Sequence, residues 1–334
     1  MASRTARRRV LRITVPGSQR EPAAAERADL LATEEPLGIR VNGQALAMTM
    51  RTPGDDIDLA AGFLISEGIV RAPGDITQIV ICTGERCGHS GSNGTSGSAA
   101  PHEGAGNIAD VTLRPGLAVA PEQRRAFLTS SACGVCGKTS IAELAVATQW
   151  DLSADSVRVP PAVLAGLPGA LRAAQRVFAA TGGLHAAGLF TAAGELLAVR
   201  EDVGRHNAVD KIVGWALRSG RLPLSGCILL VSGRASFELV QKAVLAGIPV
   251  LAAVSAPSSL AADLAAESGL TLVGFLRGGS MNVYAGSDRV EGHEGHPDPA
   301  RRSDQDLAHA GRRNHGSDPG SSLVPAPEAA PGVP

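Results

Sequence analysis

Apolar and polar residues alternate with two different periods along the chain, and these periods predict its secondary structure. Residues 37–50 alternate around Asn42-Gly43, a dipeptide typical of tight β-hairpin turns. Residues 52–55 then open a segment, 57–65, whose apolar side chains recur at helical spacing, and Gly68 ends it. The first part of the chain therefore predicts a hairpin followed by a helix.

The rest of the chain alternates between strand-like and helix-like segments. Strands are predicted at 76–82, 111–113, 184–190, 195–200, 227–231, 249–254, 270–275 and 282–284. Helices are predicted at 122–128, 140–147, 163–180, 207–217, 237–245 and 258–267. Short buried strands separated by helices are the pattern of an α/β sheet with both faces covered. The fold class is therefore α/β, with the N-terminal β-hairpin and helix forming a subdomain.

Three segments have too few large apolar side chains to form a packed core. Residues 1–28 are basic and then rich in Ala and Glu, residues 83–107 are mainly small and polar, and residues 291–334 are rich in Pro, Gly and charged groups. We expect a flexible N-terminus, a flexible insertion and a disordered C-terminal tail. The domain itself then spans residues 29–290, interrupted by the insertion.

Charge and hydropathy narrow the class of protein. The 334 residues carry a formal net charge of −1, which argues against general electrostatic binding to nucleic acid. The basic start is not followed by the apolar core of a signal peptide, and no apolar run is long enough to span a bilayer. Five cysteines in so long a chain do not form a secreted disulfide framework. We expect a cytoplasmic protein that binds neither nucleic acid nor membrane.

The most informative segment, residues 130–140, contains two thiols in C-x-x-C spacing. Glycines border Cys133 and Cys136, and Lys138 follows closely. Uncrowded sulfur, nearby backbone N–H groups and a positive charge favour the thiolate, which is the reactive form of cysteine. The pair could exchange disulfides, hold a metal ion or carry sulfur as a persulfide.

Each alternative makes a different demand on the sequence. A redox dithiol is possible, although the lead-in and the flanking residues of a thioredoxin are missing. A zinc site would need Cys82 and Cys87 to complete a set of four thiolates. A zinc deaminase is disfavoured because no His is followed two positions later by Glu. Cys227, inside an apolar strand, is most simply a core residue.

Polar residues also follow several of the predicted strands. They occur at 181–185, 201–207, 232–234 and 275–280, and they include His185, His206 and Arg234. Each segment taken alone could simply cap a helix or form a turn. Strand ends of α/β sheets are nevertheless where ligands bind, and Gly, Arg and hydroxyl groups before a helix suit phosphate. Several such segments in one sheet indicate a phosphate-rich ligand, while the separate roles of the two histidines and Arg234 stay open.

These segments together resemble the formate dehydrogenase accessory sulfurtransferase family (FdhD). The similarity covers roughly residues 33–290 and excludes the insertion and both tails. It is carried by residues 35–37, 41–43, 50–56 and 62–64, by the CGVCGK loop, and by residues 182–187, 200–211, 231–238 and 253–260. The run REDVGRHNAVDK and the CGVCGK loop are its most specific parts.

The resemblance implies a homodimer whose core is a mixed sheet flanked by helices, similar to that of cytidine deaminases. Proteins of this family accept sulfur as a persulfide from a cysteine desulfurase. They deliver it to the molybdenum (or tungsten) bis(guanine dinucleotide) cofactor before that cofactor enters formate dehydrogenase. The cofactor is thus a bound substrate, with no permanent cofactor or metal implied.

Carried over to this sequence, the resemblance makes Cys133 the persulfide carrier and Cys136 its partner. It assigns cofactor binding to six consecutive residues: Phe275, Leu276, Arg277, Gly278, Gly279 and Ser280. The alternative is a zinc-stabilised, non-catalytic chaperone of the cofactor or of formate dehydrogenase.

Overall fold

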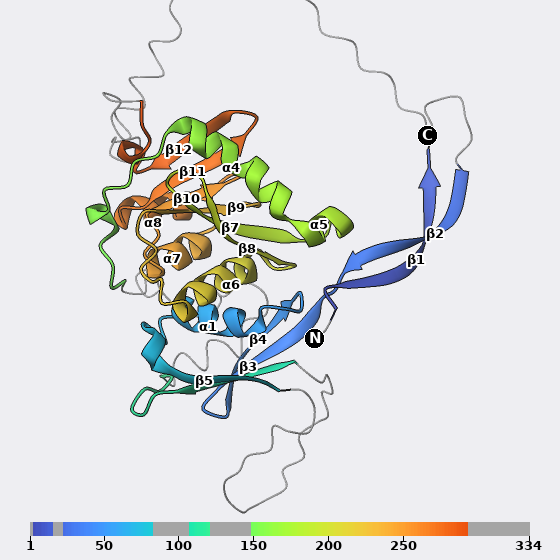
Figure 1. Cartoon of the computed structure of the whole chain (residues 1–334), viewed down its shortest axis with the longest axis horizontal. Coiled ribbons are helices and arrows are strands. Elements are labelled where there is room, and N and C mark those ends of the chain that lie inside the picture. Colours follow the sequence, from blue (N-terminus) through green and yellow to red (C-terminus); the bar gives the residue numbers. More distant parts are fainter. Residues whose placement is uncertain (1–2, 16–22, 83–106, 121–147, 293–334) are drawn as a thin grey trace, which may run out of the picture. The chain divides into compact units, whose positions relative to one another are not determined.

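The computed structural model describes residues 3–15, 23–82, 107–120 and 148–292 (Figure 1). The first half contains β1 (Thr5–Thr14), β2 (Ala23–Ala32), β3 (Glu35–Val41), β4 (Gln44–Arg51), α1 (Asp56–Ser66), β5 (Ile76–Cys82) and β6 (Ile108–Leu113). The second half contains α4 (Pro161–Ala174), α5 (Arg176–Thr181), β7 (His185–Thr191), β8 (Leu196–Asp202), α6 (Arg205–Arg218), β9 (Cys227–Val231), α7 (Phe237–Leu245), β10 (Val250–Ala253), α8 (Ser259–Glu267), β11 (Thr271–Arg277) and β12 (Ser280–Ala285). Short 3-10 turns lie at Pro73–Asp75, Leu152–Ala154 and Ser287–Arg289.

A six-stranded mixed sheet forms the centre of the C-terminal half. Its order is β12-β11-β10-β9-β7-β8, with β9, β10 and β11 parallel and the remaining neighbours antiparallel. Every strand and helix predicted between residues 184 and 285 is present, with ends that differ by a few residues. The predicted α/β class and the mixed sheet are confirmed, and the likeness to cytidine deaminases stays a prediction.

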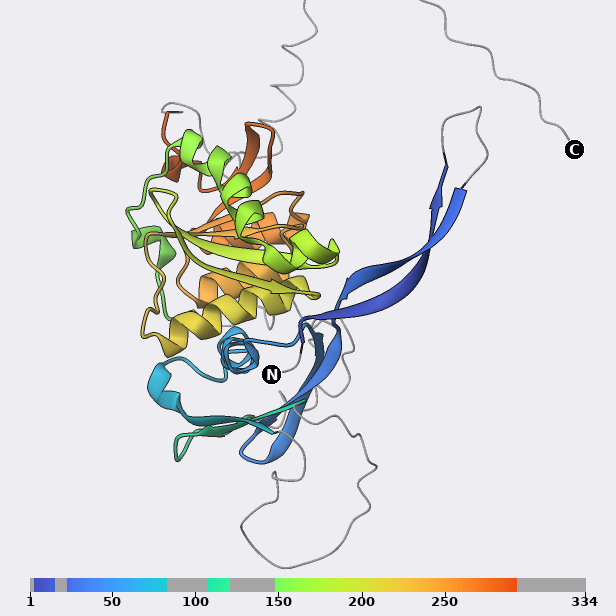
Figure 2. The same ribbon diagram turned by 45° about the vertical axis from the view of Figure 1, so that its right-hand side comes forward.

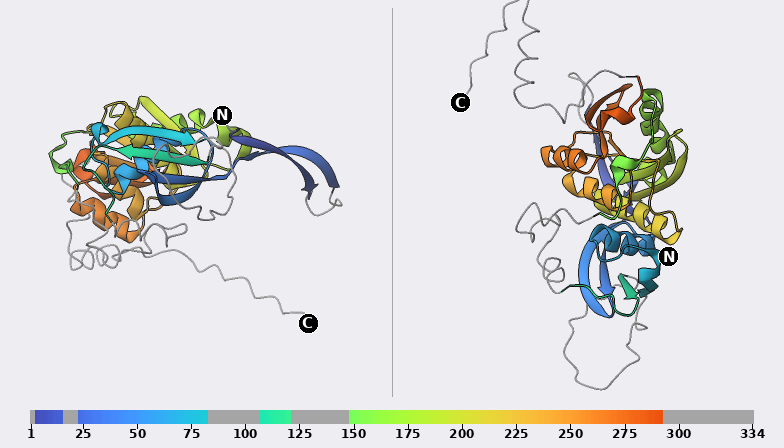
Figure 3. Two further views of the ribbon diagram at one scale, coloured as in Figure 1. Left: turned by 90° about the horizontal axis from the view of Figure 1, so that it is seen from below. Right: turned by 90° about the vertical axis from the view of Figure 1, so that its left-hand side faces the viewer.

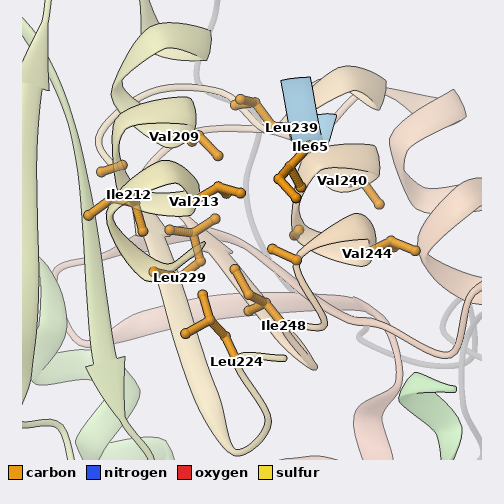
Figure 4. Packing of buried hydrophobic residues seen from close by; sticks show 14 of the residues in the cluster. Ile65, Val209, Ile212, Val213, Leu224, Leu229, Leu239, Val240, Val244 and Ile248 are labelled. Atoms are coloured by element: carbon orange, nitrogen blue, oxygen red, sulfur yellow. The ribbon is translucent and has the colours of Figure 1, made fainter. Parts of the chain in front are cut away.

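Helices cover both faces of this sheet, as the sequence predicts (Figures 1 and 2). On one face α6, α7 and α8 enclose the larger apolar core, which continues to α1 and the N-terminal strands. Figure 4 shows apolar side chains of α6, β9 and α7 filling the space between these elements, among them Val213, Leu229 and Leu239. On the other face α4 packs Leu164, Leu167 and Leu171 into a second, smaller core.

A four-stranded sheet of order β4-β3-β6-β5 belongs to the N-terminal half. The predicted β3–β4 hairpin turns at Asn42 and Gly43, whose φ angles are 50° and 75°. Such left-handed angles at both central residues are what a two-residue hairpin turn requires. The helices α1 and α6 lie between this sheet and the six-stranded sheet (Figure 3).

The two helices α1 and α6 approach each other so closely that their backbones touch. A Cβ atom on Gly62 of α1 would lie 1.8 Å from the carbonyl oxygen of Asp210 in α6. A Cβ atom on Gly214 of α6 would lie 1.8 Å from the carbonyl oxygen of Asp58 in α1. Only residues without a side chain fit at both positions, so these two glycines set the distance between the helices.

The segment before α1 is held by a buried guanidinium. Arg51, 1% exposed, ends β4, and its Nη1 lies 3.1 Å from the Glu35 carboxylate of β3. Its Nε lies 3.0 Å from the carboxylate of Asp56, the first residue of α1. One side chain therefore joins two strands to the start of the helix.

The structure departs from the sequence predictions near the N-terminus. Residues 1–28 are predicted to be flexible, whereas β1 and β2 pair from Thr5–Ala32 to Thr14–Ala23 (Figure 2). Hydrophobic periodicity misses this ribbon because it covers no core: Leu11 and Ile13 are 61% and 60% exposed. Pairing between strands is a nonlocal property that such a pattern does not reveal.

A second departure concerns the predicted helix at 163–180, which is two helices. The chain leaves the helical conformation at Gln175, and α5 begins at Arg176. The carboxylate of Glu201 accepts hydrogen bonds from the backbone N–H groups of Val177 and Phe178, at 2.9 and 2.7 Å. A residue of β8 thus satisfies the free N–H groups of a new helix start, a partner that sequence periodicity cannot indicate.

The α1–α6 contact predicts that Gly62→Ala lowers the free energy of unfolding by about 3 kcal/mol, because the added methyl group must displace a backbone. The matched control is Gly166→Ala in α4, where a Cβ atom meets nothing within 4 Å. That change should raise stability by about 0.5–1 kcal/mol through the lower entropy of the unfolded chain. Chemical denaturation of both variants tests this, and equal stability of Gly62→Ala and wild type would contradict it.

Candidate functional site at the strand ends

Five segments converge at one edge of the six-stranded sheet. The strands β8, β9, β10 and β11 all end there, and β7, which runs in the opposite direction, begins there. We call this edge the strand-end surface; it comprises residues 182–185, 202–206, 232–236, 254–258 and 277–280. Polar segments that the sequence places next to several strands therefore lie at one edge of the sheet, and the phosphate-rich ligand that they indicate stays a prediction.

The carboxylate of Asp202 is the centre of a buried network beneath this surface. Asp202 is completely buried. One of its oxygens accepts hydrogen bonds from Gly204 N at 2.8 Å and from Asn207 Nδ2 at 3.1 Å. The other accepts from Thr52 N at 3.1 Å and from Lys211 Nζ at 2.7 Å. Four donors satisfy the carboxylate, as burial of a charge requires.

Lys211 gives the same network its positive charge. Its ammonium group is buried and also donates to the backbone oxygen of Thr52 at 2.9 Å. Thr52 in turn accepts from Val203 N through its hydroxyl at 3.2 Å. The network therefore connects the segment before α1 to the end of β8 and the start of α6. Removal of either charge would leave the other buried and unpaired, which is strongly destabilising.

Most other charged residues of segment 200–211 also pair within the protein. Arg200 Nη2 lies 3.0 Å from the Asp58 carboxylate of α1. The Asp210 carboxylate contacts Lys242 Nζ of α7 at 2.7 Å and accepts from the Ser66 hydroxyl of α1. The sequence left two interpretations of these residues open: capping and ion pairing, or ligand binding. Their contacts within the protein support capping and ion pairing.

Two residues of segment 200–211, His206 and Arg205, are instead candidates for contact with a ligand. His206 Nε2 lies 2.7 Å from the Glu238 carboxylate and 3.3 Å from the Ser236 hydroxyl, both near the start of α7. The Nε atom of Arg205 is buried, yet it has no hydrogen-bond partner among the described residues. Ser236 and Glu238 were not predicted as partners of His206; their position directly after the β9 segment was the available signal.

His185, the first residue of β7, lies beside these groups. A Cβ atom on Gly233 would lie 3.5 Å from its Nδ1, so the β9 segment passes close to the ring. Burial, and then electrostatic interactions with Arg205 and His206, lower the pKa of His185, while Asp202 opposes the shift. The imidazole is therefore neutral at neutral pH and offers one donor and one acceptor.

Residues 232–234 contribute one internal contact and one exposed charge. The Ser232 hydroxyl accepts from Ala186 N at 2.9 Å, which fixes the end of β9 against β7. Arg234 is exposed, so its guanidinium is available to a ligand. His185, Arg205, His206 and Arg234 thus bring nitrogen donors from three elements to the strand-end surface.

Residues 275–280 are part of a β-hairpin, whereas the sequence predicts a loop there. β11 continues to Arg277 through an irregular register, and Gly278 and Gly279 form the two-residue turn before Ser280. Phe275 has φ +52°, a strained angle for a residue with a side chain, and its N–H donates to Ser255 O at 3.1 Å. Arg277 pairs with Ser280 across the turn, and this pairing between the strands extends β11 beyond its predicted end.

Within this hairpin, the six residues assigned to cofactor binding differ in how exposed they are to a ligand. The Leu276 side chain is completely buried, so only its backbone could meet a ligand. Arg277 is exposed and lies over the ring of Phe275 at 5.5 Å, and no atom lies within 4 Å of a Cβ built on Gly278 or Gly279. The turn is thus open around its two glycines and its guanidinium is exposed, and the assignment stays a prediction.

Cys133 and Cys136 lie outside the described residues, as do Cys87 and the helices predicted at 122–128 and 140–147. Cys82, the last residue of β5, is buried. Cys227 starts β9 at the opposite edge of the sheet, and burial, together with Asp155, raises the pKa of its thiol, which keeps the thiol protonated. Within the described ranges, no three His, Cys, Asp or Glu side chains are grouped to hold a metal ion. In the same ranges, no helix is long and apolar enough to cross a bilayer.

Comparison with known proteins agrees with the resemblance. The model of the FdhD/NarQ family matches residues 32–291. The chain is 58% identical to the sulfur carrier protein FdhD of Streptomyces avermitilis over 290 residues, which cover 86% of this chain and 95% of the relative. It is 56% identical to the protein of the same name from Nocardia farcinica over 286 residues, with the same coverage of both chains.

A solved structure shares the fold. The crystal structure of a candidate formate dehydrogenase accessory protein from Desulfotalea psychrophila matches with a TM-score of 0.63 at 24% identity, covering 86% of this chain and all of the other. The present chain belongs to the FdhD/NarQ family, and the resemblance predicted from its motifs is confirmed.

The lowered pKa of His185 predicts a contribution to the pH dependence of stability. Because the unfolded chain binds this proton more tightly, the folded state loses stability as pH falls below about 6.5 and toward the pKa of the folded protein. His185→Asn should flatten the fall in unfolding free energy between pH 7 and pH 5. Urea titrations at several pH values measure the difference, and a steeper fall in the variant would contradict the predicted sign.

Proposed function

We propose that this protein carries sulfur as a cysteine persulfide for the assembly of formate dehydrogenase, acting as a sulfurtransferase in the cytoplasm. The observation that carries the proposal is the family match over residues 32–291, which contains the C-x-x-C loop. The relatives matched over most of their length are named sulfur carrier proteins. A carrier needs an accessible thiolate, and the Gly-bordered Cys133 and Cys136 with Lys138 have the composition that favours one.

The proposed chemistry is two exchange steps at sulfur. The Cys133 thiolate attacks the outer sulfur of a persulfide on a cysteine desulfurase; a new S–S bond forms, and the desulfurase leaves as a thiolate. An electron-rich group of the acceptor then attacks the outer sulfur on Cys133, which regenerates the thiolate. Cys136 assists as the second thiol of the pair.

The proposed acceptor is the molybdenum bis(guanine dinucleotide) cofactor, bound as a substrate by a homodimer. Its diphosphate groups suit the open Gly278-Gly279 turn and the exposed Arg277. Charge-assisted hydrogen bonds from a guanidinium to phosphate are among the strong polar contacts in proteins. The strained φ of Phe275, two residues before Arg277, is a feature found at ligand sites.

The persulfide assignment predicts that Cys133→Ala folds normally but gains no sulfur after incubation with a cysteine desulfurase and cysteine. Intact-mass measurement detects one added sulfur atom on the wild-type chain. Cys227→Ala is the matched control, since that thiol lies at the other sheet edge, and it should load like wild type. Loading that persists in Cys133→Ala but is lost in Cys136→Ala would reverse the two roles. Bound zinc without any labile sulfur would favour the chaperone alternative.

The cofactor assignment predicts that Arg277→Ala weakens the binding of GDP by about tenfold or more, because one charge-assisted contact of about 1.5–3 kcal/mol is removed. Isothermal titration calorimetry measures the affinity. Sulfur loading should not change, since the substitution leaves the thiols untouched. Wild-type affinity for GDP in the variant would exclude this hairpin from the site.

A further inference from the structure

The β1–β2 ribbon is a two-stranded sheet of its own, so each of its strands has one edge that pairs with no other strand in the described part of the chain. Leu11 and Ile13 of β1 are 61% and 60% exposed. An isolated two-stranded ribbon is at best marginally stable in water, whereas three or more strands with an apolar face can be stable. A long exposed edge is also a template for a further strand. The ribbon therefore indicates a partner that adds strands to it.

The base of the ribbon is fixed to the rest of the chain. Arg4, which directly precedes β1, places its Nη2 2.6 Å from the carboxylate of Asp55, the residue before α1. The backbone oxygen of Arg4 accepts a hydrogen bond from the N–H of Thr33, directly after β2, at 2.9 Å. Beyond this base, residues 23–28 of β2 are all exposed. The edge of β2 is therefore accessible to a partner along most of its length.

The charges of β1 make that strand unsuited to pairing with its own copy. The strand carries four exposed arginines and no carboxylate: Arg7, Arg8, Arg9 and Arg12. No register of β1 against a second β1 places an opposite charge beside an arginine. Several registers place arginines beside each other, and like charges directly opposite are destabilising.

The other strand, β2, carries charges of both signs at Glu26, Arg27 and Asp29. When two copies of one strand pair antiparallel across a twofold axis, each residue is opposite one an even number of positions away, because only such residues share a face. Registers centred on Glu26, Arg27 or Asp29 place that residue opposite its own copy, which opposes like charges. A register centred on Ala28 instead opposes Arg27 to Asp29 of the partner subunit, and the symmetry makes this pair twice.

The side chains that this register brings together are accessible. The side chains of Arg27 and Asp29 are 46% and 42% exposed, and within one chain they make only a long contact, 3.4 Å from Nη2 to Oδ1. Ala28 is exposed and small, so two copies can approach closely at the axis. The resulting four-stranded sheet carries Leu11 and Ile13 of both copies on one face, since residues two apart in a strand share a face.

We propose that β2 pairs with β2 of a second copy of this chain, antiparallel and centred on Ala28, so that two ribbons form one four-stranded sheet. The homodimer itself is part of the proposed function, and to that extent the inference rests on it. The position of the interface rests instead on the exposed edge of β2 and on the order of its charges. Sulfur transfer plays no part in this contact.

The first test is disulfide cross-linking of the full-length chain. Ala28→Cys places two thiols opposite each other at the axis, where Cα atoms lie about 4.5–5.5 Å apart, within the range of a disulfide. Mild oxidation should join the chains through residue 28, and mass spectrometry of tryptic peptides identifies the bond. Arg9→Cys is the matched control, because Arg9 is opposite Ala28 within the ribbon. Three strand spacings, about 14 Å, separate its two copies and should prevent the bond.

The second test reverses the charges. Arg27→Asp should raise the Kd of the dimer about tenfold or more, because two opposite-charge pairs become two like-charge pairs. Asp29→Arg should do the same. The double variant, Arg27→Asp with Asp29→Arg, restores opposite charges and should dimerise like wild type. Sedimentation equilibrium over a dilution series measures the Kd of each chain.

The outcomes separate this interface from the carrier function. Cross-linking through residue 28, with recovery of the dimer in the double variant, supports the interface. A dimer that neither charge reversal weakens, or Arg9→Cys chains that cross-link as readily as Ala28→Cys chains, overturns it. A chain that stays monomeric also overturns it, whether or not the ribbon then binds another protein or a nucleic acid. Sulfur loading is measured separately by intact mass: a monomer that loads sulfur leaves the carrier function standing, and a cross-linked dimer that never loads sulfur leaves the interface standing.

Discussion

The backbone contact between α1 and α6 is the constraint on which the rest of the structure depends. Gly62 and Gly214 let the helices meet without intervening side chains. That approach places the N-terminal half of the chain against the helical layer of the six-stranded sheet, and both join one apolar core. Ion pairs surround the contact, with Asp58 opposite Arg200 and Asp210 opposite Lys242. The glycine contact and the ion pairs therefore favour the same arrangement of α1 and α6.

This arrangement determines which polar groups are available at the strand ends. Because Thr52 precedes α1 closely, its backbone reaches Asp202 and Lys211 and helps to fix the turn into α6. Four donors, among them Thr52 and Lys211, saturate the carboxylate of Asp202. One buried network thus connects the segment before α1 to the turn between β8 and α6.

The strand-end surface differs in character from one side to the other. Near β8 and β7, buried or partly buried side chains supply the donors, and burial keeps His185 neutral. Near β11, the polar groups belong to a hairpin turn that contains the exposed Arg277 and the open Gly278 and Gly279. The two sides of this edge therefore differ in how far their polar groups are removed from solvent.

The sequence alone determined the fold class, nearly all strands and helices after residue 184, the β3–β4 hairpin and the family, because these follow from local periodicity, turn chemistry and specific motifs. The sequence alone could not show which distant residues contact one another. The β1–β2 ribbon, the break at Gln175 and the extension of β11 depend on contacts with distant residues or strands. The same holds for the site: the sequence named segment 200–211, but only the tertiary structure showed that Asp202 and Asp210 are paired with Lys211 and Lys242. Hydrogen-bond saturation depends on the positions of donors far away in the chain, and a linear pattern carries no record of those positions.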